Sequence, residues 1–427
     1  MHSSLNGITE APGKVWFFEL AAAVIDADRC VQCGACVAAC PTDSIGVNAD
    51  DLPYLVKMCT GCSLCWDFCP RGGLRYEATW PEAAALAAER VAEKDRPTAA
   101  PVPITAAVDG DGLPAVITGI DPTPGLGVVI GSYAARVHAD SKYRAAGSQD
   151  GGVVTAVLIA ALEQGAIDGA LVSRVDRTTP WRGVPFVATT RDQILEAGGS
   201  FYNQTMALAA LDLTRVGLDE NAKIAVVGTP CEIQGIRALQ AREWYRGVSQ
   251  VDAIVLTIAL MCTKNFDYKR LMLGAFADER GLDLNEIGKV DVIHGRMLAW
   301  DRSGAVLVDE PVKSFHSAAL KGCDECADFL GRSADISVGS VGSMNGWTSV
   351  IIRTERGRLA FQAARAKLDV RGLDDPAALL RLDALDKKIA GRTLQRKLDP
   401  DAPLFIDFDE HVRTYEGSDR QPVYIRH

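Results

Sequence analysis

Two copies of one cysteine spacing lie near the start of the chain, and they constrain its fold more than any other feature. Each copy reads C-x2-C-x2-C-x3-C-P, and the second begins 29 residues after the first. Three closely spaced cysteines wrap a tight loop around one [4Fe–4S] cube, with backbone amides pointing at its sulfurs. We expect the fourth to open a short helix and reach across to a second cube. The first copy comprises Cys30, Cys33, Cys36 and Cys40, and the second comprises Cys59, Cys62, Cys65 and Cys69.

This spacing resembles that of bacterial two-cluster ferredoxins, in which the fourth cysteine of each copy ligates the other cluster. Zinc sites favour two separated C-x2-C pairs, and disulfides are rare in reducing compartments, so both alternatives are weaker. Two clusters in one small module commonly move single electrons. The predicted ligands are Cys30, Cys33, Cys36 and Cys69 for one cluster, and Cys59, Cys62, Cys65 and Cys40 for the other.

Composition excludes several other classes of protein. The 427 residues include 12 cysteines and carry a net charge of -10, which argues against a nucleic-acid partner. No basic region followed by an apolar run opens the sequence, and no stretch has the roughly 18 apolar residues of a membrane span. We therefore predict a cytoplasmic protein in a reducing compartment.

The middle of the chain divides into regions of different character. We predict a ferredoxin module over residues 1–80, and a helix and linker over 81–124. Within the latter, 81–93 is rich in Ala and Glu, and 96–124 is rich in Pro without any period. That segment is either a passive tether or an insert that docks a partner.

From residue 125 onward, strand patterns alternate with helix patterns, which is typical of an α/β domain with a partly parallel sheet. We expect strands at 166–175, 223–228 and 251–259, with Cys262 at the end of the third. We expect helices at 153–163, 205–216 and 233–244.

Two glycine-containing turns precede predicted helices. In the first, 147–152, Asp150 could cap the helix, and the glycines let backbone approach a ligand. The second, 228–231, follows a predicted strand at the place where a sheet binds ligands. Each turn is either plain helix capping or part of a binding site. The four cysteines left over are either core thiols or a third metal site: Cys231, Cys262, Cys323 and Cys326.

Several ordered motifs resemble those of the family of coenzyme F420 hydrogenase/dehydrogenase beta subunits. They are QDGGVVT at 149–155, GTPCEIQG at 228–235, CTKNFDY at 262–268, GCDECADF at 322–329, ADISVGSVGS at 334–343, and GWT with VIIRT at 346–354. The resemblance implies FAD and a third [4Fe–4S] cluster held by Cys231, Cys262, Cys323 and Cys326. It implies that the FAD is lined by Gln149, Asp150, Gly151, Gly152, Thr155, Ser200, Tyr202, Asn203, Gln204, Gly228, Thr229 and Pro230.

The expected architecture is therefore α/β, or α+β over the whole chain. A small ferredoxin-like module with two [4Fe–4S] clusters precedes a large mixed α/β flavin-binding domain at 125–360. A helical extension and tail follow at 361–427.

The resemblance implies a flavin-dependent oxidoreductase that links hydride transfer, with F420 or another soluble carrier, to one-electron transfer. Members that use F420 often have an acidic residue where this chain has Lys264. Two alternatives stay open. One is an electron-transfer subunit that links ferredoxin or NAD(P)H to a larger complex, such as a 2-oxoacid oxidoreductase, formate dehydrogenase or hydrogenase. The other is a ferredoxin-dependent ring reductase. The sequence shows no nucleophile–base pair and thus no catalytic residue.

Overall fold

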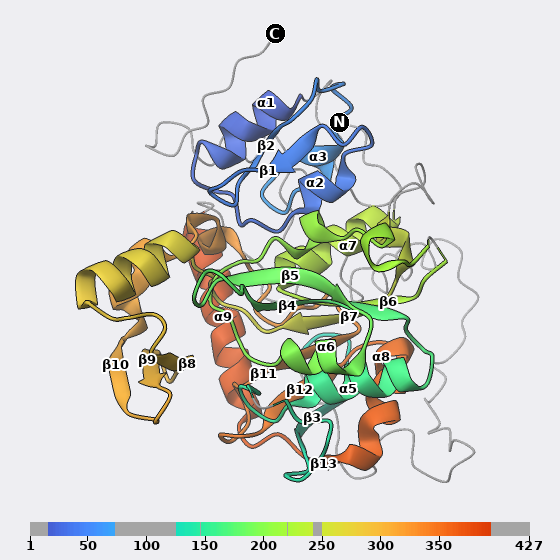
Figure 1. Cartoon of the computed structure of the whole chain (residues 1–427), viewed down its shortest axis with the longest axis vertical. Coiled ribbons are helices and arrows are strands. Elements are labelled where there is room, and N and C mark those ends of the chain that lie inside the picture. The colour runs from blue at the N-terminus through green and yellow to red at the C-terminus, as the bar shows by residue number, and fades with distance from the viewer. Residues whose placement is uncertain (1–15, 73–124, 146, 220, 242–249, 394–427) are drawn as a thin grey trace, which may run out of the picture.

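The computed structural model describes residues 16–72, 125–145, 147–219, 221–241 and 250–393. They form a cysteine-rich N-terminal module, a large sheet flanked by helices, and a smaller three-stranded sheet at one side (Figure 1). The helix predicted at 81–93 and the linker at 96–124 lie outside the described residues. Within the described residues, no helix is long and apolar enough to cross a membrane.

The N-terminal module is built from very short elements around buried aromatic side chains. Its antiparallel pair β1 and β2 joins Ile45 to Leu55, and Trp66 and Phe68 are almost fully buried. Elements this short stabilise one another poorly, which is typical of a module that relies on bound clusters. Its elements are α1 (Phe17–Leu20), the helical turn Ala21–Ile25, α2 (Ala35–Ala39), β1 (Ile45–Val47), β2 (Pro53–Leu55) and α3 (Leu64–Asp67).

An eight-stranded mixed sheet forms the body of the molecule, in the order β13-β3-β12-β11-β7-β6-β4-β5. The four central strands β11, β7, β6 and β4 are parallel, and the remaining pairings are antiparallel. The strands are β3 (Gly131–Val137), β4 (Gly169–Val175), β5 (Gly183–Ala188), β6 (Ile224–Gly228), β7 (Ile254–Leu260), β11 (Ile336–Gly339), β12 (Thr348–Ile352) and β13 (Leu368–Arg371). β13 thus joins the sheet from beyond residue 360.

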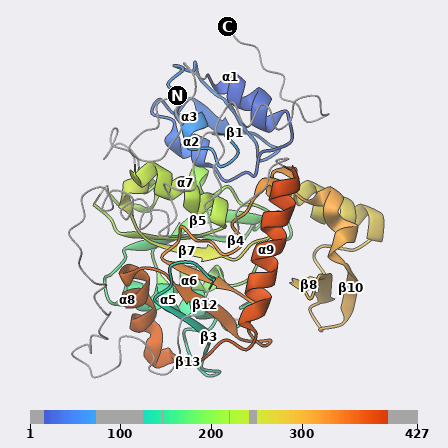
Figure 2. The ribbon, with the colours of Figure 1, turned by 180° about the vertical axis from the view of Figure 1, so that it is seen from behind.

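Helices cover both faces of this sheet, which buries its central strands as parallel strands require. Helices α5 (Val153–Glu163) and α8 (Glu355–Ala364) pack together on one face. Helix α7 (Pro230–Ala241) covers the other face, and its apolar cluster includes Val31 and Phe68 of the N-terminal module. α9 (Pro376–Thr393) runs along the body (Figure 2). The short helix α6 (Arg191–Glu196) follows β5.

The third part is an antiparallel sheet of β8 (Ile287–Ile293), β9 (Arg296–Asp301) and β10 (Val306–Pro311). The helical segments Lys269–Asp278 and Val312–Ala318 pack against it around Phe276 and Phe315. This sheet forms the side lobe at the left of Figure 1. Because the chain leaves β7 to build the lobe and returns through β11, the lobe lies beside the carboxyl end of β7.

The predicted α/β architecture is confirmed. The expected helix at 153–163 is α5, and the expected strand at 223–228 is β6. The strand expected at 251–259 begins only at Ile254, after a 3-10 turn, and ends before Cys262. The helix expected at 233–244 begins at Pro230, and its last residues lie outside the described part of the chain. The strand expected at 166–175 begins at Gly169.

Two local predictions are wrong. The segment 205–216 contains two 3-10 turns rather than one helix, Ala207–Ala210 and Thr214–Val216. The Asp212 carboxylate accepts hydrogen bonds from the backbone and hydroxyl of Thr214, and such local bonds compete with helix formation. The fourth cysteine of each ferredoxin copy follows a short helix instead of opening one, since Cys40 is the C-cap of α2 and Cys69 lies after α3.

Candidate functional site

The carboxyl ends of the parallel strands meet the predicted binding turns along one edge of the large sheet. Register aligns Gly228 with Ala259 and Leu260 with Val338, so that Thr229 and Cys262 leave the same edge. Ligands of open α/β sheets bind outside this edge. The turns predicted from sequence to bind FAD and a third cluster therefore lie along the same edge.

Backbone amides point at the cysteine sulfurs of the N-terminal module. The amides of Gln32 and Gly61 donate to Cys30 Sγ and Cys59 Sγ, each at 3.4 Å. The amides of Ser44 and Arg71 donate to Cys40 Sγ at 3.2 Å and Cys69 Sγ at 3.4 Å. Such bonds stabilise thiolate sulfur and set cluster potentials, as the ferredoxin pattern requires.

The first predicted ligand set lies together in the module. Burial raises the pKa of the Cys36 thiol, and the neighbouring Cys30 and Cys69 raise it further. Burial likewise raises the pKa of Cys33, with contributions from Cys69 and Cys36. Dry thiols crowded in this way are poor free thiols and good ligands, because a bound cluster compensates their negative charges.

The second predicted set lies next to the first. Its four cysteines line one small hollow, together with Thr42 and Thr60. Burial raises the pKa of Cys65, and Cys62, Cys59, Cys69 and Cys40 add to the effect. Cys65 also raises the pKa of Cys36, so the two sets adjoin.

The third group of cysteines gathers at the carboxyl edge of the sheet. Burial raises the pKa of Cys262, and the other three raise it further: Cys323, Cys231 and Cys326. Thr229 Oγ1 lies 3.1 Å from Cys231 Sγ. Cys231 and Cys323 also pack against the apolar cluster that contains Cys33, so this group faces the first ferredoxin set.

None of the twelve cysteines forms a disulfide. Among the described residues, no three His, Cys, Asp or Glu side chains have the spacing that a single metal ion needs.

The glycine turn before α5 packs closely on the sheet. A Cβ on Gly151 would lie 2.4 Å from the Ala135 carbonyl oxygen, so only glycine fits. Gly152 is the N-cap of α5 with φ of 72°, and no side chain caps the helix. The expectation that Asp150 caps it is therefore wrong, and the uncapped amides at the helix start suit an anion.

Asp150 instead faces the side lobe. Burial raises its pKa to about 6, with Asp291 adding to the rise and Lys289 opposing it. Gln149 Nε2 donates to the Val290 carbonyl at 3.3 Å. The turn is thus held between the large sheet and β8.

The segment around Tyr202 connects this turn to the third cysteine group. The Tyr202 hydroxyl donates to Asp291 at 3.0 Å and accepts from the Val292 amide at 3.0 Å. Gln204 Nε2 donates to Thr229 Oγ1 at 3.3 Å, and Asn265 Nδ2 donates to Gln204 Oε1.

The other predicted flavin residues are placed as follows. Asn203 is buried and accepts from the Gly183 amide at 3.1 Å. Thr155 is buried in the first turn of α5, and Ser200 is half-buried. Pro230 begins α7 directly after Gly228 and Thr229.

Sequence reasoning missed several polar residues at this edge. Thr348 accepts from the Gly151 amide through its hydroxyl at 3.0 Å. Glu232, fully buried, accepts from the Thr229 amide at 2.9 Å and the Ala207 amide at 3.0 Å. Asp291 and Lys289 come from β8, about 140 residues after the turn they face. Only Thr348 and Glu232 lie within the motifs, so no motif indicated the β8 pair.

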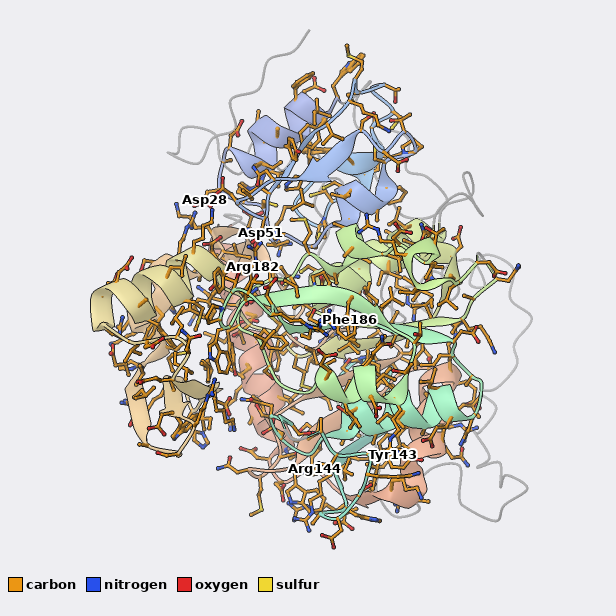
Figure 3. All side chains as sticks on the ribbon, in the orientation of Figure 1. Asp28, Asp51, Tyr143, Arg144, Arg182 and Phe186 are labelled. Carbon is orange, nitrogen blue, oxygen red and sulfur yellow. The ribbon has the colours of Figure 1, made fainter. Side chains whose placement is uncertain are left out.

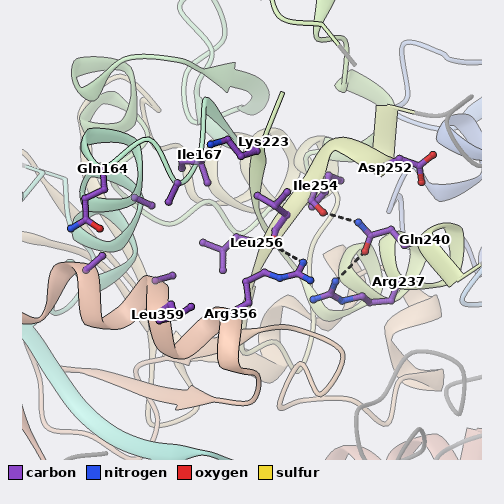
Figure 4. A pocket seen from close by; sticks show the side chains of 15 residues that line it. Gln164, Ile167, Lys223, Arg237, Gln240, Asp252, Ile254, Leu256, Arg356 and Leu359 are labelled. Carbon is purple, nitrogen blue, oxygen red and sulfur yellow. Dashed lines mark hydrogen bonds between the residues drawn. The ribbon is translucent and has the colours of Figure 1, made fainter. Parts of the chain in front are cut away.

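A separate cavity of about 950 Å³ lies at the opposite, amino edge of the sheet, between α5, α7 and α8 (Figure 4). Its cationic side chains have protein partners: Arg237 pairs with Asp335 at 2.8 Å, and Arg356 donates to the Val255 carbonyl at 2.6 Å. None of the twelve cysteines and none of the predicted flavin residues line it.

Comparisons with known proteins find matches to both the N-terminal module and the body of the molecule. Residues 133–212 and 221–375 match the N-terminal and C-terminal regions described as coenzyme F420 hydrogenase/dehydrogenase, beta subunit. Residues 23–75 match a 4Fe-4S dicluster domain.

Individual relatives extend over half or more of the chain. The coenzyme F420 hydrogenase subunit beta of Methanosarcina barkeri is 36% identical over 51% of this chain and 74% of its own length. A subunit of the F(420)H(2) dehydrogenase of Methanosarcina mazei is 27% identical over 84% of this chain and 89% of its own. A chain in the F420-reducing [NiFe] hydrogenase complex of Methanosarcina barkeri superposes with a TM-score of 0.57 and 31% identity, covering 65% of this chain and 94% of that one.

Proposed function

The chain belongs to the family of coenzyme F420 hydrogenase/dehydrogenase beta subunits, which are oxidoreductases, and from that premise we propose that it converts hydride transfer with coenzyme F420 into one-electron transfer. FAD and three [4Fe–4S] clusters supply this chemistry when bound, because flavin accepts a hydride and releases single electrons whereas clusters carry one electron each. The chain's own residues would hold these groups in series.

The serial order of the cysteine groups carries the proposal. Cys231 of the third group packs against the apolar cluster that contains Cys33 of the first ferredoxin set, and Cys36 of that set lies in one cluster with Cys65 of the second. Electron transfer falls steeply with distance, so three adjoining groups make a path whereas scattered thiols would not. The proposed third ligand set is Cys231, Cys262, Cys323 and Cys326.

The proposed flavin residues lie at the inner end of this path. The uncapped start of α5 offers amides to the FAD pyrophosphate. Thr229 lies directly beside Cys231, and Gln204 donates a hydrogen bond to Thr229. Half-buried Tyr202 and Asp150 close the site toward β8 and limit access of water. The protein thereby orients the flavin and shields it, and no side chain acts as a nucleophile.

The outer end of the path reaches the surface. Cys62 is exposed. Around it, the hairpin β1–β2 and the following loop expose apolar side chains, and Met58 is 84% exposed. A one-electron partner, such as a ferredoxin or a subunit of a larger oxidoreductase, would dock on this face over the second cluster.

An anaerobic reduction assay tests the proposal. Reconstituted protein is mixed separately with reduced coenzyme F420, NADH, NADPH and reduced ferredoxin, and the flavin absorbance band is followed. We expect reduced F420 alone to bleach the band rapidly. Rapid reduction by ferredoxin with no response to F420 or either nicotinamide would favour the electron-transfer subunit or the ring reductase instead.

Iron content tests the third cluster independently. Three cubes require about twelve iron atoms per chain, and two require about eight. A value near eight, with both ferredoxin signals present, contradicts the proposed role of the third cysteine group.

A further inference from the structure

Two buried arginines flank the first ferredoxin set. Arg29 directly precedes Cys30, and Arg71 lies two residues after Cys69. Both side chains are almost fully buried, with residue exposures of 0% and 1%. An arginine buried to this degree has to donate nearly every N–H to an acceptor. The acceptors therefore identify the segments that the arginine holds in place.

Arg29 reaches from the ferredoxin module to the C-x2-C turn of the flavin domain. Its Nε and Nη2 donate to the two Glu325 oxygens at 2.8 and 2.7 Å, and both side chains are fully buried. Its Nη1 donates to the Ala23 carbonyl at 2.6 Å. Glu325 lies between Cys323 and Cys326, so this two-pronged pair joins the ligand loops of two different cysteine groups.

Arg71 makes a second connection between the same loops. Its Nε donates to the Gly322 carbonyl at 2.6 Å, and its amide donates to Cys69 Sγ at 3.4 Å. Arg71 therefore links a sulfur of the first set to the residue directly before Cys323.

The two arginines are also joined to each other by hydrogen bonding. Arg29 Nη2 donates to the Arg71 carbonyl at 3.0 Å, and Arg71 Nη1 donates to the Pro70 carbonyl at 2.8 Å. A Cβ on Gly322 would lie 1.9 Å from the Arg29 carbonyl oxygen, so the two loops are in direct backbone contact.

Other ion pairs across this junction are of a different kind. Asp51 pairs with Arg182 at 2.6 Å and Asp50 with Lys269 at 2.6 Å, and all four side chains are partly or largely exposed. Figure 3 shows Asp51 and Arg182 at the boundary between the module and the body. Exposed pairs contribute little and are screened by salt, whereas a buried pair forms only when both loops are in place.

We propose that Arg71 and the Arg29–Glu325 pair are positioning residues that hold the first ferredoxin set and the third cysteine group at a fixed separation for electron transfer. This rests on the proposed function, because it requires a cluster in the third group. When both groups are loaded, one electron moves: one centre is oxidised, its neighbour is reduced, and no bond is made or broken.

The decisive variant is Arg71→Lys, which keeps the positive charge but loses the planar guanidinium that reaches Gly322. Arg182→Lys is the matched control, since it makes the same change in an exposed pair at the same junction. Three quantities are measured on the full reconstituted chain: iron content, the dipolar coupling between reduced clusters by electron paramagnetic resonance, and the rate at which ferredoxin-module clusters are reduced after a pulse of reduced F420.

We expect both variants to retain the native iron content. In Arg71→Lys, the dipolar coupling should weaken and the reduction rate should fall about 10-fold or more, the usual effect of losing a partner in the outer shell of a metal site. Arg182→Lys should keep the native coupling and rate. Glu325→Gln removes the charge partner of Arg29 and should weaken the coupling and slow the reduction as Arg71→Lys does. If Arg71→Lys loses iron, Glu325→Gln provides the test instead.

The outcomes distinguish the positioning role from the proposed function. Native coupling and native rate in Arg71→Lys, with three clusters present, overturn the positioning role and leave the proposed function intact. Native protein that holds only the two ferredoxin clusters overturns the proposed function, and the positioning role falls with it.

Discussion

Replacing Gly322 by alanine tests the close contact between the two loops. The added Cβ would lie 1.9 Å from the Arg29 carbonyl oxygen, about 1.5 Å inside the 3.4 Å at which ordinary contact begins. The two atoms nearest to the added Cβ belong to the Arg29 backbone, so a change of side-chain rotamer cannot relieve the contact. The Arg29 side chain is itself fixed by Glu325. The ferredoxin module has to shift as a unit.

The expected cost follows from this geometry. Overpacking of a filled site costs about 1–3 kcal/mol, and a contact between two backbone segments falls at the upper end. At about 3 kcal/mol, Gly322→Ala should lower the Tm of this chain of 427 residues by roughly 3 °C, because the entropy of unfolding is about 2.1 cal/mol/K per residue. Because the shift separates the first and third cysteine groups, the variant should also transfer electrons between them more slowly.

Anaerobic thermal unfolding of the reconstituted protein provides the measurement. Gly372→Ala is the control, since a Cβ there meets nothing within 4 Å. Both substitutions reduce the freedom of the unfolded chain equally, so their difference isolates the steric term. Equal Tm values for the two variants would refute the reasoning and show that the loops are not in contact.

Three further predictions concern the site. Cys326→Ser should lower iron by about four atoms per chain while the ferredoxin signals persist; unchanged iron means that Cys326 is not a ligand. Tyr202→Phe leaves the buried Asp291 without its hydroxyl donor, at a cost of about 1–3 kcal/mol, and should lower the FAD-to-protein ratio after gel filtration; an unchanged ratio places the flavin elsewhere. Burial and Asp291 raise the pKa of Asp150 from 3.8 to about 6. Between these two pH values the native state binds a proton that the unfolded state has lost. The free energy of unfolding therefore falls by up to about 3 kcal/mol as pH rises from about 4 to 6. Asp150→Asn should therefore raise the Tm of the flavin-free protein at pH 7 but not at pH 4, and equal effects at both pH values would contradict the assignment.

Elements with strong local signals were predictable from the sequence. Helix α5 has the predicted bounds because an apolar run follows two glycines directly. Strand β6 is an uninterrupted apolar run that ends in a glycine turn. The segment 205–216 was mispredicted because Asp212 and the left-handed Met206 favour turns over a helix, and neither effect appears in an apolar pattern.

The candidate site likewise has a part that the sequence predicted and a part that it did not. The two-cluster module was predictable because each cysteine loop closes over a few residues and the spacing encodes its geometry. The part played by β8 was not, because Asp291 and Lys289 meet Asp150 only after the side lobe folds back over the sheet edge.

The sequence by itself determined that the chain carries a two-cluster ferredoxin module and a flavin-type α/β domain, because local spacing and ordered motifs specify both. Only the tertiary structure decided how they are joined. Arg29, Arg71 and Glu325 stand in ordinary sequence positions, and the Arg29–Glu325 pairing spans 296 residues. Burial makes that pairing obligatory, since a charge removed from water needs its partner, and no pattern along the chain expresses a contact of that length.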